Sequence, residues 1–533
     1  MSANAVVSPH TAVHGKLAKG PGALGMGVFG LALVVGFGYA AMHLISDLST
    51  VHSASVYPFV LLGISLLIAL GFEFVNGFHD TANAVATVIY THSLDPHIAV
   101  VWSGMWNFIG VLTSSGAVAF AIVSLLPVEL ILQVGSGSGF AMVFALLTAA
   151  IIWNLGTWYF GLPSSSSHTM IGSIIGVGIA NQLMATKNGT SGVDWEQAAG
   201  VGKALLCSPI IGFGVAALLL LACKALIPDK HLYEAPKGDE PPPFWIRCLL
   251  ILTCTGVSYG HGSNDGQKGM GLIMLILVGT VPTAYALNHA VTTQETADFV
   301  AVSQSASTAV QHYITADSTV ENAPQIVTDY VRTRELAPNT LPALRQMIDS
   351  IATGLATYKQ LKSLPAEQTP NFRNNMYLVS EGLRLLKKTN NPRISAADWT
   401  MLTNYKTHID NATKFIPTWV KVAVALALGL GTMVGWKRIV ITVGEKIGKQ
   451  HLTYAQGAAA EITAMLTIKG FDLLGLPVST THVLSSGIAG TMAANHSGLQ
   501  WSTVKALAMA WVLTLPASIV LAGSLFWAFR HMA

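Results

Sequence analysis

Two aspartates in similar polar contexts interrupt strongly apolar stretches of the chain. The first lies in Asn76-Gly-Phe-His79-Asp80-Thr81-Ala-Asn83-Ala84, and the second lies in His261-Gly-Ser-Asn264-Asp265-Gly-Gln267-Lys268-Gly269. An aspartate at membrane depth costs about 2.5–3.5 kcal/mol on insertion scales, so it is usually present for function. Two such sites in matching contexts indicate a transporter built from a duplicated unit.

Both aspartates favour cation chemistry, because a carboxylate repels a free anion. A metal ion, a sodium ion or a proton would be held by Asp80 and Asp265, and a metal ion would have both carboxylates as ligands. Neutral oxygen ligands stand beside them on Thr81, Asn83 and Asn264. A cation between these carboxylates and an oxyanion would neutralise both, which predicts cotransport. The alternative is a purely structural aspartate, hydrogen-bonded or paired with a lysine.

A second duplicated motif carries hydroxyl groups. Residues 161–169 read Gly-Leu-Pro-Ser-Ser-Ser-Ser-His-Thr, and residues 475–483 read Gly-Leu-Pro-Val-Ser-Thr-Thr-His-Val. Proline suits the first turn of a helix, and Ser and Thr cap helix starts. A helix that starts inside the membrane points free N–H groups and a partial positive charge at its ligand. Two facing starts would surround a tetrahedral oxyanion with donors; the alternative is plain capping. The candidate donors are Ser165, Ser166, Ser167, Ser479, Thr480 and Thr481.

Other ionisable side chains in these motifs have open roles. Lys268 either pairs with Asp265 or meets the oxyanion as a point charge. His168 and His482 match each other across the two motifs and suit proton coupling, although a histidine is more often a hydrogen-bonded packing residue. Glu73 lies shortly before the first motif, and it is either a proton relay or a residue near the membrane interface.

Composition places the chain in a membrane. Of 533 residues, 52% are hydrophobic and only 10% are charged, whereas soluble proteins carry about 25% charge. Backbone groups in lipid must be satisfied internally, so the apolar runs predict helices. The net charge is only +3, and the sequence has no run of basic residues that would indicate a nucleic acid partner. Spanning runs lie at 26–44, 57–75, 97–123, 139–161, 203–227, 244–260, 413–435, 455–475 and 503–529, with shorter Gly-interrupted pieces at 77–90, 163–183, 266–286 and 477–494.

The motifs divide the chain into two homologous halves. There are 83 residues from Asp80 to Pro163 and 212 from Asp265 to Pro477, and the excess of 129 is close to the 125 residues of a polar segment at 288–412. That segment holds eleven acidic and eleven basic side chains, and its periodicity predicts helices. We therefore expect an all-α polytopic membrane protein with two repeats, broken or re-entrant helices and a soluble helical insertion.

The expected organisation follows from these boundaries. Inverted topology of the repeats is expected by analogy with other transporters. Basic loops at 224–247 and 437–449 are expected to face the cytoplasm. The expected parts are a flexible N-terminus at 1–25, an extra transmembrane helix at 26–48, a first repeat at 55–227, a polar linker at 228–243, and a second repeat at 244–287 and 413–530, interrupted by the insertion at 288–412.

An enzyme is not expected. No Gly-x-Ser-x-Gly turn surrounds the serine runs, and a serine next to a histidine in sequence does not make a catalytic dyad. The chain also has no Gly-x-x-x-x-Gly-Lys-Ser/Thr loop for ATP. With an enzyme and an ATP-driven pump set aside for this chain, secondary active transport is the function that the sequence favours.

The motifs together resemble the inorganic phosphate transporter (PiT) family, in particular its bacterial low-affinity Pit branch. The hallmark of that family is similar to Gly-Ala-Asn-Asp-Val-Ala-Asn-Ala, and residues 77–84 and 262–268 stand in its place here. The resemblance covers about 55–286 and 413–530 of this chain. It implies that Asp80, Asn83 and Asp265 form cation and substrate sites, and that the hydroxyl runs contact phosphate. The branch is regarded as a proton symporter of neutral metal–phosphate complexes.

The chain departs from the family hallmark at two positions. His79 replaces an asparagine in the first motif and Lys268 replaces one in the second. The loss of neutral oxygen ligands favours proton or metal coupling over sodium. We expect proton symport of phosphate with Mg²⁺, Ca²⁺, Mn²⁺, Co²⁺ or Zn²⁺ across the bacterial inner membrane, with no covalently bound cofactor. The alternatives are a sodium-coupled phosphate symporter and a permease for another oxyanion such as sulfate. A homodimer is left open.

Overall fold

The computed structural model describes Leu17 and residues 22–49, 56–80, 82–132, 136–185, 192–236, 241–314, 320–390 and 392–532. Thr81 lies outside the described residues, and so does the side chain of Asn83. Regular structure within the described residues is helical, apart from one isolated bridge between Gly448 and Leu499. The expectation of an all-α chain is therefore confirmed.

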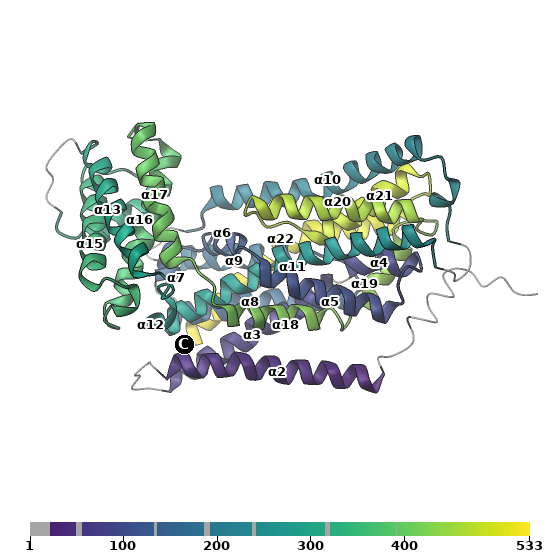
Figure 1. Cartoon of the computed structure of the whole chain (residues 1–533), viewed down its shortest axis with the longest axis horizontal. Coiled ribbons are helices and arrows are strands. Elements are labelled where there is room, and N and C mark those ends of the chain that lie inside the picture. The colour runs from purple at the N-terminus through teal and green to yellow at the C-terminus, as the bar shows by residue number, and fades with distance from the viewer. Residues whose placement is uncertain are drawn as a thin grey trace, which may run out of the picture.

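Long helices lie side by side and form the body of the molecule (Figure 1). Five helical stretches of the described chain are long and apolar enough to cross a membrane, or up to seven if two strongly bent pairs count as one span each. The helices of this body are α2 (Ala23–Leu48), α3 (Tyr57–Asp80), α5 (Pro96–Thr113), α8 (Gly137–Tyr159), α9 (Ser166–Met184), α10 (Trp195–Leu226), α11 (Phe244–Thr280), α18 (Thr418–Gly431), α20 (Tyr454–Leu473), α21 (Thr480–Ala494) and α22 (Trp501–Met532). Shorter elements are α4 (Ala82–Tyr90), α6 (Ala117–Val123), α7 (Val128–Leu132), η1 (Lys230–Leu232), α12 (Pro282–Tyr285), α19 (Lys437–Ile441) and η3 (Thr442–Lys446).

Two spans differ from the sequence expectation. The run expected at 97–123 breaks into α5 and α6, which are bent by 76° at Gly116, a glycine with a left-handed φ of 86°. Conversely, the segment expected at 244–260 and most of the one expected at 266–286 form the single helix α11, which ends at Thr280 before the short α12. Glycines of α11 serve close packing and do not break it, since a Cβ at Gly262 would lie only 2.1 Å from the carbonyl oxygen of Asn107 on α5.

The hydroxyl motifs begin two helices, α9 and α21, that start inside the protein. Helix α9 packs along α22, where a Cβ at Gly176 would lie 2.2 Å from the carbonyl oxygen of Ile519. Helix α21 packs along α10 in the same way, since a Cβ at Gly490 would lie 2.2 Å from the carbonyl oxygen of Phe213. The two helices extend toward opposite ends of the molecule (Figure 1). Each half thus supplies a short helix that packs on the last long helix of the other half, and the inverted relation of the repeats stays a prediction.

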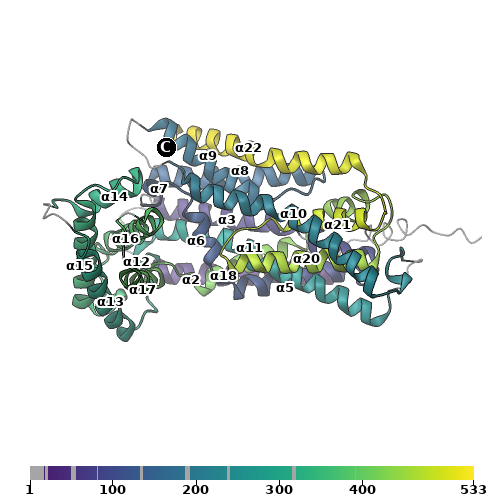
Figure 2. The ribbon, with the colours of Figure 1, turned by 90° about the horizontal axis from the view of Figure 1, so that it is seen from above.

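The polar segment forms a helical unit at one end of the long helices (Figures 1 and 2). Its own core contains Phe299, Leu344, Ile348, Leu386 and Tyr405, all at most 1% exposed. Its helices are α13 (Thr293–Gln311), α14 (Ala323–Thr333), α15 (Thr340–Tyr358), η2 (Leu361–Ser363), α16 (Thr369–Thr389) and α17 (Ala396–Thr413).

Ion pairs tie this helical unit to the start of α10. Asp194 lies 3.1 Å from a guanidinium nitrogen of both Arg334 and Arg384, and Glu196 lies 2.6 Å from Lys388. Asp194 also accepts a hydrogen bond from the backbone N–H of Gln197, which caps α10. One carboxylate therefore both starts a membrane helix and docks the helical unit.

Candidate cation and oxyanion site

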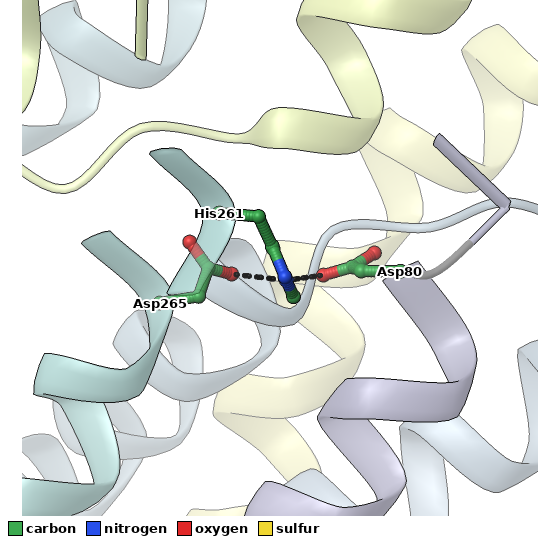
Figure 3. A group of neighbouring side chains, drawn as sticks. All are labelled: Asp80, His261 and Asp265. Atoms are coloured by element: carbon green, nitrogen blue, oxygen red, sulfur yellow. Dashed lines mark ion pairs between the residues drawn. The ribbon is translucent and has the colours of Figure 1, made fainter. Parts of the chain in front are cut away.

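Asp80 and Asp265 face each other across one imidazole, that of His261 (Figure 3). Asp80 is the last residue of α3, and Asp265 lies in the middle of α11. The Nε2 atom of His261 lies 3.6 Å from Asp80 Oδ2 and 3.7 Å from Asp265 Oδ2. All three side chains are buried. The structure thus brings the two predicted carboxylates together and adds a third polar group between them.

Asn107 orients the His261 ring. The Nδ1 atom of His261 lies 2.6 Å from Asn107 Oδ1, while the amide nitrogen of Asn107 donates to the carbonyl oxygen of Ser103. Because an amide oxygen can only accept, Nδ1 carries the proton and Nε2 presents its lone pair. Nε2 is buried and has no hydrogen-bond partner among the described residues.

The geometry around His261 fits a divalent cation. Each of Asp80, His261 and Asp265 offers one ligand atom, and these atoms lie within 4.8 Å of one another. Within the part of the chain that the structure describes, Asp265 Oδ1 is a further buried oxygen without a hydrogen-bond partner. Two carboxylates and an imidazole oriented by a second polar group form a typical donor set for ions such as Mn²⁺, Co²⁺ or Zn²⁺.

The starts of α9 and α21 touch these carboxylates directly. The Ser166 hydroxyl lies 2.9 Å from Asp80 Oδ2 and 3.1 Å from Asp265 Oδ2. Thr481 donates to Asp80 Oδ1 at 2.5 Å. An ion held by the two aspartates would therefore sit next to two helix N-termini, where partial positive charge favours an anion.

The remaining hydroxyls of the two motifs have different partners. Ser165 and Ser479 are matched N-caps, since each side chain accepts a hydrogen bond at 3.2 Å from the backbone N–H three residues later. Ser167 donates to the carbonyl oxygen of Val478 at 2.8 Å. The buried hydroxyl of Thr480 has no hydrogen-bond partner in the described part of the chain, and its predicted contact with an oxyanion stays a prediction.

Lys268 is fully buried and pairs with a carboxylate. Its ammonium lies 2.6 Å from Asp265 Oδ2 and also contacts the Ser167 hydroxyl. Of the two partners expected for Lys268, an aspartate or an oxyanion, the structure shows Asp265. Contact with phosphate stays a prediction, and the link to Ser167 places the ammonium at the hydroxyl motif.

His168 and His482 meet at the two helix starts. Their ring centroids lie 4.5 Å apart, and the His482 ring also lies against Trp511. His168 Nδ1 and His482 Nε2 are buried and have no hydrogen-bond partners in the ranges that the structure describes. The matched histidines are therefore neighbours of the site, and their coupling role stays a prediction.

One predicted ligand, Asn264, is hydrogen-bonded to backbone groups in this structure, and its predicted cation role stays a prediction. The amide of Asn264 donates to the carbonyl oxygen of Leu476 at 3.1 Å and accepts from the backbone N–H of Val478 at 3.3 Å. Asn264 therefore stabilises the loop before α21. Its side chain points away from that of Asp265, because consecutive residues of a helix point in different directions. Thr81 and the Asn83 side chain lie outside the described residues, so their predicted roles have no structural account.

Sequence reasoning missed His261 as a candidate cation ligand, and it missed Asn107 altogether. His261 precedes Asp265 by four residues, which places both side chains on one face of a helix, so the spacing did carry a signal. Asn107 carries only a weaker signal, a single amide in an apolar helix.

Three comparisons place the chain among known proteins. The model of the phosphate transporter family matches residues 76–522. The low-affinity inorganic phosphate transporter PitA of Escherichia coli K12 is 42% identical over 496 residues, which cover 87% of this chain and 96% of that protein. PitB of the same strain is 40% identical over 495 residues, 89% of this chain and 97% of that protein. A solved structure of a sodium-dependent phosphate transporter aligns with a TM-score of 0.49 and 17% identity, covering 89% of this chain and 100% of that chain.

Proposed function

The chain belongs to the phosphate transporter family, and on that premise we propose that it carries phosphate as a neutral divalent metal–phosphate complex in symport with protons. The transport would run across the bacterial inner membrane. One observation carries the proposal: the carboxylates of Asp80 and Asp265 flank the Nε2 atom of His261, the Ser166 hydroxyl at the start of α9 contacts both carboxylates, and Thr481 at the start of α21 donates to Asp80.

The charges of the site support a metal–phosphate complex over phosphate alone. Two buried carboxylates and the Lys268 ammonium leave one net negative charge. A free phosphate dianion would add two further negative charges in a medium of low dielectric, where like charges repel strongly. A divalent cation held by Asp80, His261 and Asp265 cancels the phosphate charge. In this proposal the cation is cargo, and it travels with the anion.

The contacts of the helix starts support phosphate as the anion. Ser166 and Thr481 form hydrogen bonds with the proposed cation ligand Asp80. The Thr480 hydroxyl, which has no hydrogen-bond partner among the described residues, lies in the same first turn as Thr481. Backbone N–H groups of both first turns add donors. A tetrahedral oxyanion between these turns would contact the cation on one side and neutral donors on the other.

Sodium coupling is the second candidate, because the carboxylates of Asp80 and Asp265 are oxygen ligands of the kind that sodium prefers. The nitrogen ligand of His261 favours a transition metal over sodium, which prefers oxygen ligands. Sulfate or another oxyanion is the third candidate.

Uptake of radiolabelled phosphate into proteoliposomes tests the proposal. Imposed pH and Na⁺ gradients are compared, each with and without Mg²⁺ or Mn²⁺. We expect accumulation that needs the divalent cation and an inward proton gradient. Uptake that follows a Na⁺ gradient would establish sodium coupling instead, and full competition by sulfate would change the substrate.

A further inference from the structure

Glu73 is a buried carboxyl group outside the cation cluster. It lies on α3 seven residues before Asp80, and two helical turns place the two side chains on the same side of the helix. Its exposed fraction is 0%. Oε2 accepts one long hydrogen bond, at 3.4 Å, from the amide of Asn76, and Oε1 has no hydrogen-bond partner among the described residues.

The carboxyl of Glu73 fits into a space that α11 leaves open. A Cβ at Gly269 would lie 2.3 Å from Glu73 Oε1 and 2.4 Å from Cγ, so any other residue there would displace the carboxyl. Gly269 directly follows Lys268 and lies one turn beyond Asp265. The carboxyl is therefore built into the contact between α3 and α11, beside the charges of the site.

A proton is the ligand that this environment suits. An ionised carboxylate accepts several hydrogen bonds, whereas Glu73 has, among the described residues, only the long bond from Asn76 and a contact with the backbone of Gly269. Burial with so few donors makes the charged form costly. The charged groups that act on Glu73 are Lys268 and Asp265, both on α11. A protonated carboxyl removes the unbalanced charge without any further partner.

The other helices packed against α3 contribute few titratable side chains. Helix α18 brings Lys421, which donates to the carbonyl oxygen of Ser114. Helix α4 brings Tyr90, which donates to Glu445. Helix α8 brings Tyr159 at its last position, and α9 brings His168 in its first turn. Lys268 thus remains the cation that Glu73 influences most directly.

We propose that Glu73 is the proton-binding residue of this transporter, an inference that rests on the proposed proton symport. Ionised Glu73 and Asp265 both attract Lys268 and reduce the positive potential that its ammonium offers at Ser167. A proton that adds to the Glu73 carboxylate removes one of these attractions, and Lys268 then favours phosphate at the hydroxyl motif. By linkage, bound phosphate favours the proton equally. The proton leaves Glu73 on the other side of the membrane, together with the cargo.

The test separates transport from proton coupling in proteoliposomes. Phosphate exchange at equal pH measures transport, and accumulation under an inward proton gradient measures coupling. In Glu73→Gln we expect accumulation to fall about tenfold or more, while exchange stays within about threefold of wild type. Glu73→Asp keeps a titratable carboxyl, and it should recover part of the accumulation.

Glu461→Gln is the matched control. Glu461 is also 0% exposed, but both of its oxygens accept hydrogen bonds, from Thr87 and Thr253. We expect this variant to keep its response to the gradient. Gradient-driven accumulation that persists in Glu73→Gln would overturn the inference, and so would an equal loss in Glu461→Gln. A wild-type protein that exchanges phosphate but ignores the pH gradient would instead contradict the proposed proton symport.

Discussion

Thr481 donates a 2.5 Å hydrogen bond to Asp80, although the two residues come from opposite halves of the chain. This bond joins a cation ligand to the helix start that we assign to phosphate. Asp80→Asn and Asp265→Asn should abolish coupled phosphate uptake, because an amide cannot offset the charge of a divalent cation. Uptake by cells, normalised to protein in the membrane, measures this loss. Full uptake in either variant would remove the cation role.

His261 should set the preference among divalent cations. In His261→Asn we expect Mn²⁺-supported uptake to fall about 10- to 100-fold, and Mg²⁺-supported uptake to fall less, because magnesium prefers oxygen ligands. Asn107→Ala, which only frees the ring, should shift the preference in the same direction but less. Equal losses with the two metals would argue that His261 has a packing role only.

The hydroxyls of the two motifs should separate into ligands and caps. Ser166→Ala combined with Thr480→Ala should raise the KM for phosphate, since it removes one donor from each helix start. Ser165→Ala with Ser479→Ala is the control, and the loss of these caps should lower stability by about 1 kcal/mol per helix. If the first pair leaves KM unchanged, all of these hydroxyls serve helix structure.

Docking of the helical unit should be insensitive to pH in the physiological range. Burial alone would raise the pKa of Asp194, but the Gln197 N–H and the charges of Arg334, Arg384 and Lys388 hold this pKa below its ordinary value of 3.8. Because the pKa of Asp194 is lowered, its ionised carboxylate contributes fully to docking at any pH above the ordinary pKa. This contribution is lost only when the pH falls through the lowered pKa.

Hydrogen exchange of α16 should therefore be constant from about pH 5 to pH 8, after correction for intrinsic rates, and should rise in acid. Asp194→Asn keeps a capping side chain but loses the ion pairs, and it should increase exchange at all these pH values. Protection that changes between pH 6 and pH 8 would implicate another group.

The helical unit should face away from the cytoplasm. Basic residues gather where α10 ends, where α11 begins and at α19, and the helical unit lies at the opposite end of the molecule (Figure 1). Short loops rich in Lys and Arg face the cytoplasm. In a cysteine-free background, Glu367→Cys should therefore react with a membrane-impermeant maleimide in intact cells, and Glu234→Cys should not. The reverse pattern would invert the assigned orientation.

Much of the fold was predictable because apolar length and helix-start chemistry are local signals. The expected run at 139–161 corresponds to α8, and the hydroxyl motifs do start helices, at Ser166 and Thr480. The continuity of α11 was not predictable, since the glycines that indicated a break serve contacts with distant helices. Gly266, for example, makes room for Val111 on α5.

The candidate site was predictable residue by residue only in part. The duplicated motif pointed to Asp80 and Asp265, and a duplication can be recognised from the sequence alone. Which other residues of the motif face the two carboxylates depends on side-chain direction, which the sequence does not show. His261 points at Asp265 and Asn264 points at the loop before α21, although the two residues lie in one motif. The pairing of Lys268 with Asp265 follows from their i,i+3 spacing, but its contact with Ser167 depends on tertiary packing.

Simultaneous uptake of radiolabelled phosphate and radiolabelled manganese into proteoliposomes tests the central claim most directly. If the cation held by Asp80, His261 and Asp265 travels with the anion at the helix starts, the two labels should enter in a fixed ratio. Both fluxes should then vanish together in Asp265→Asn. Phosphate uptake that continues unchanged after all divalent cations are removed with a chelator would contradict the account.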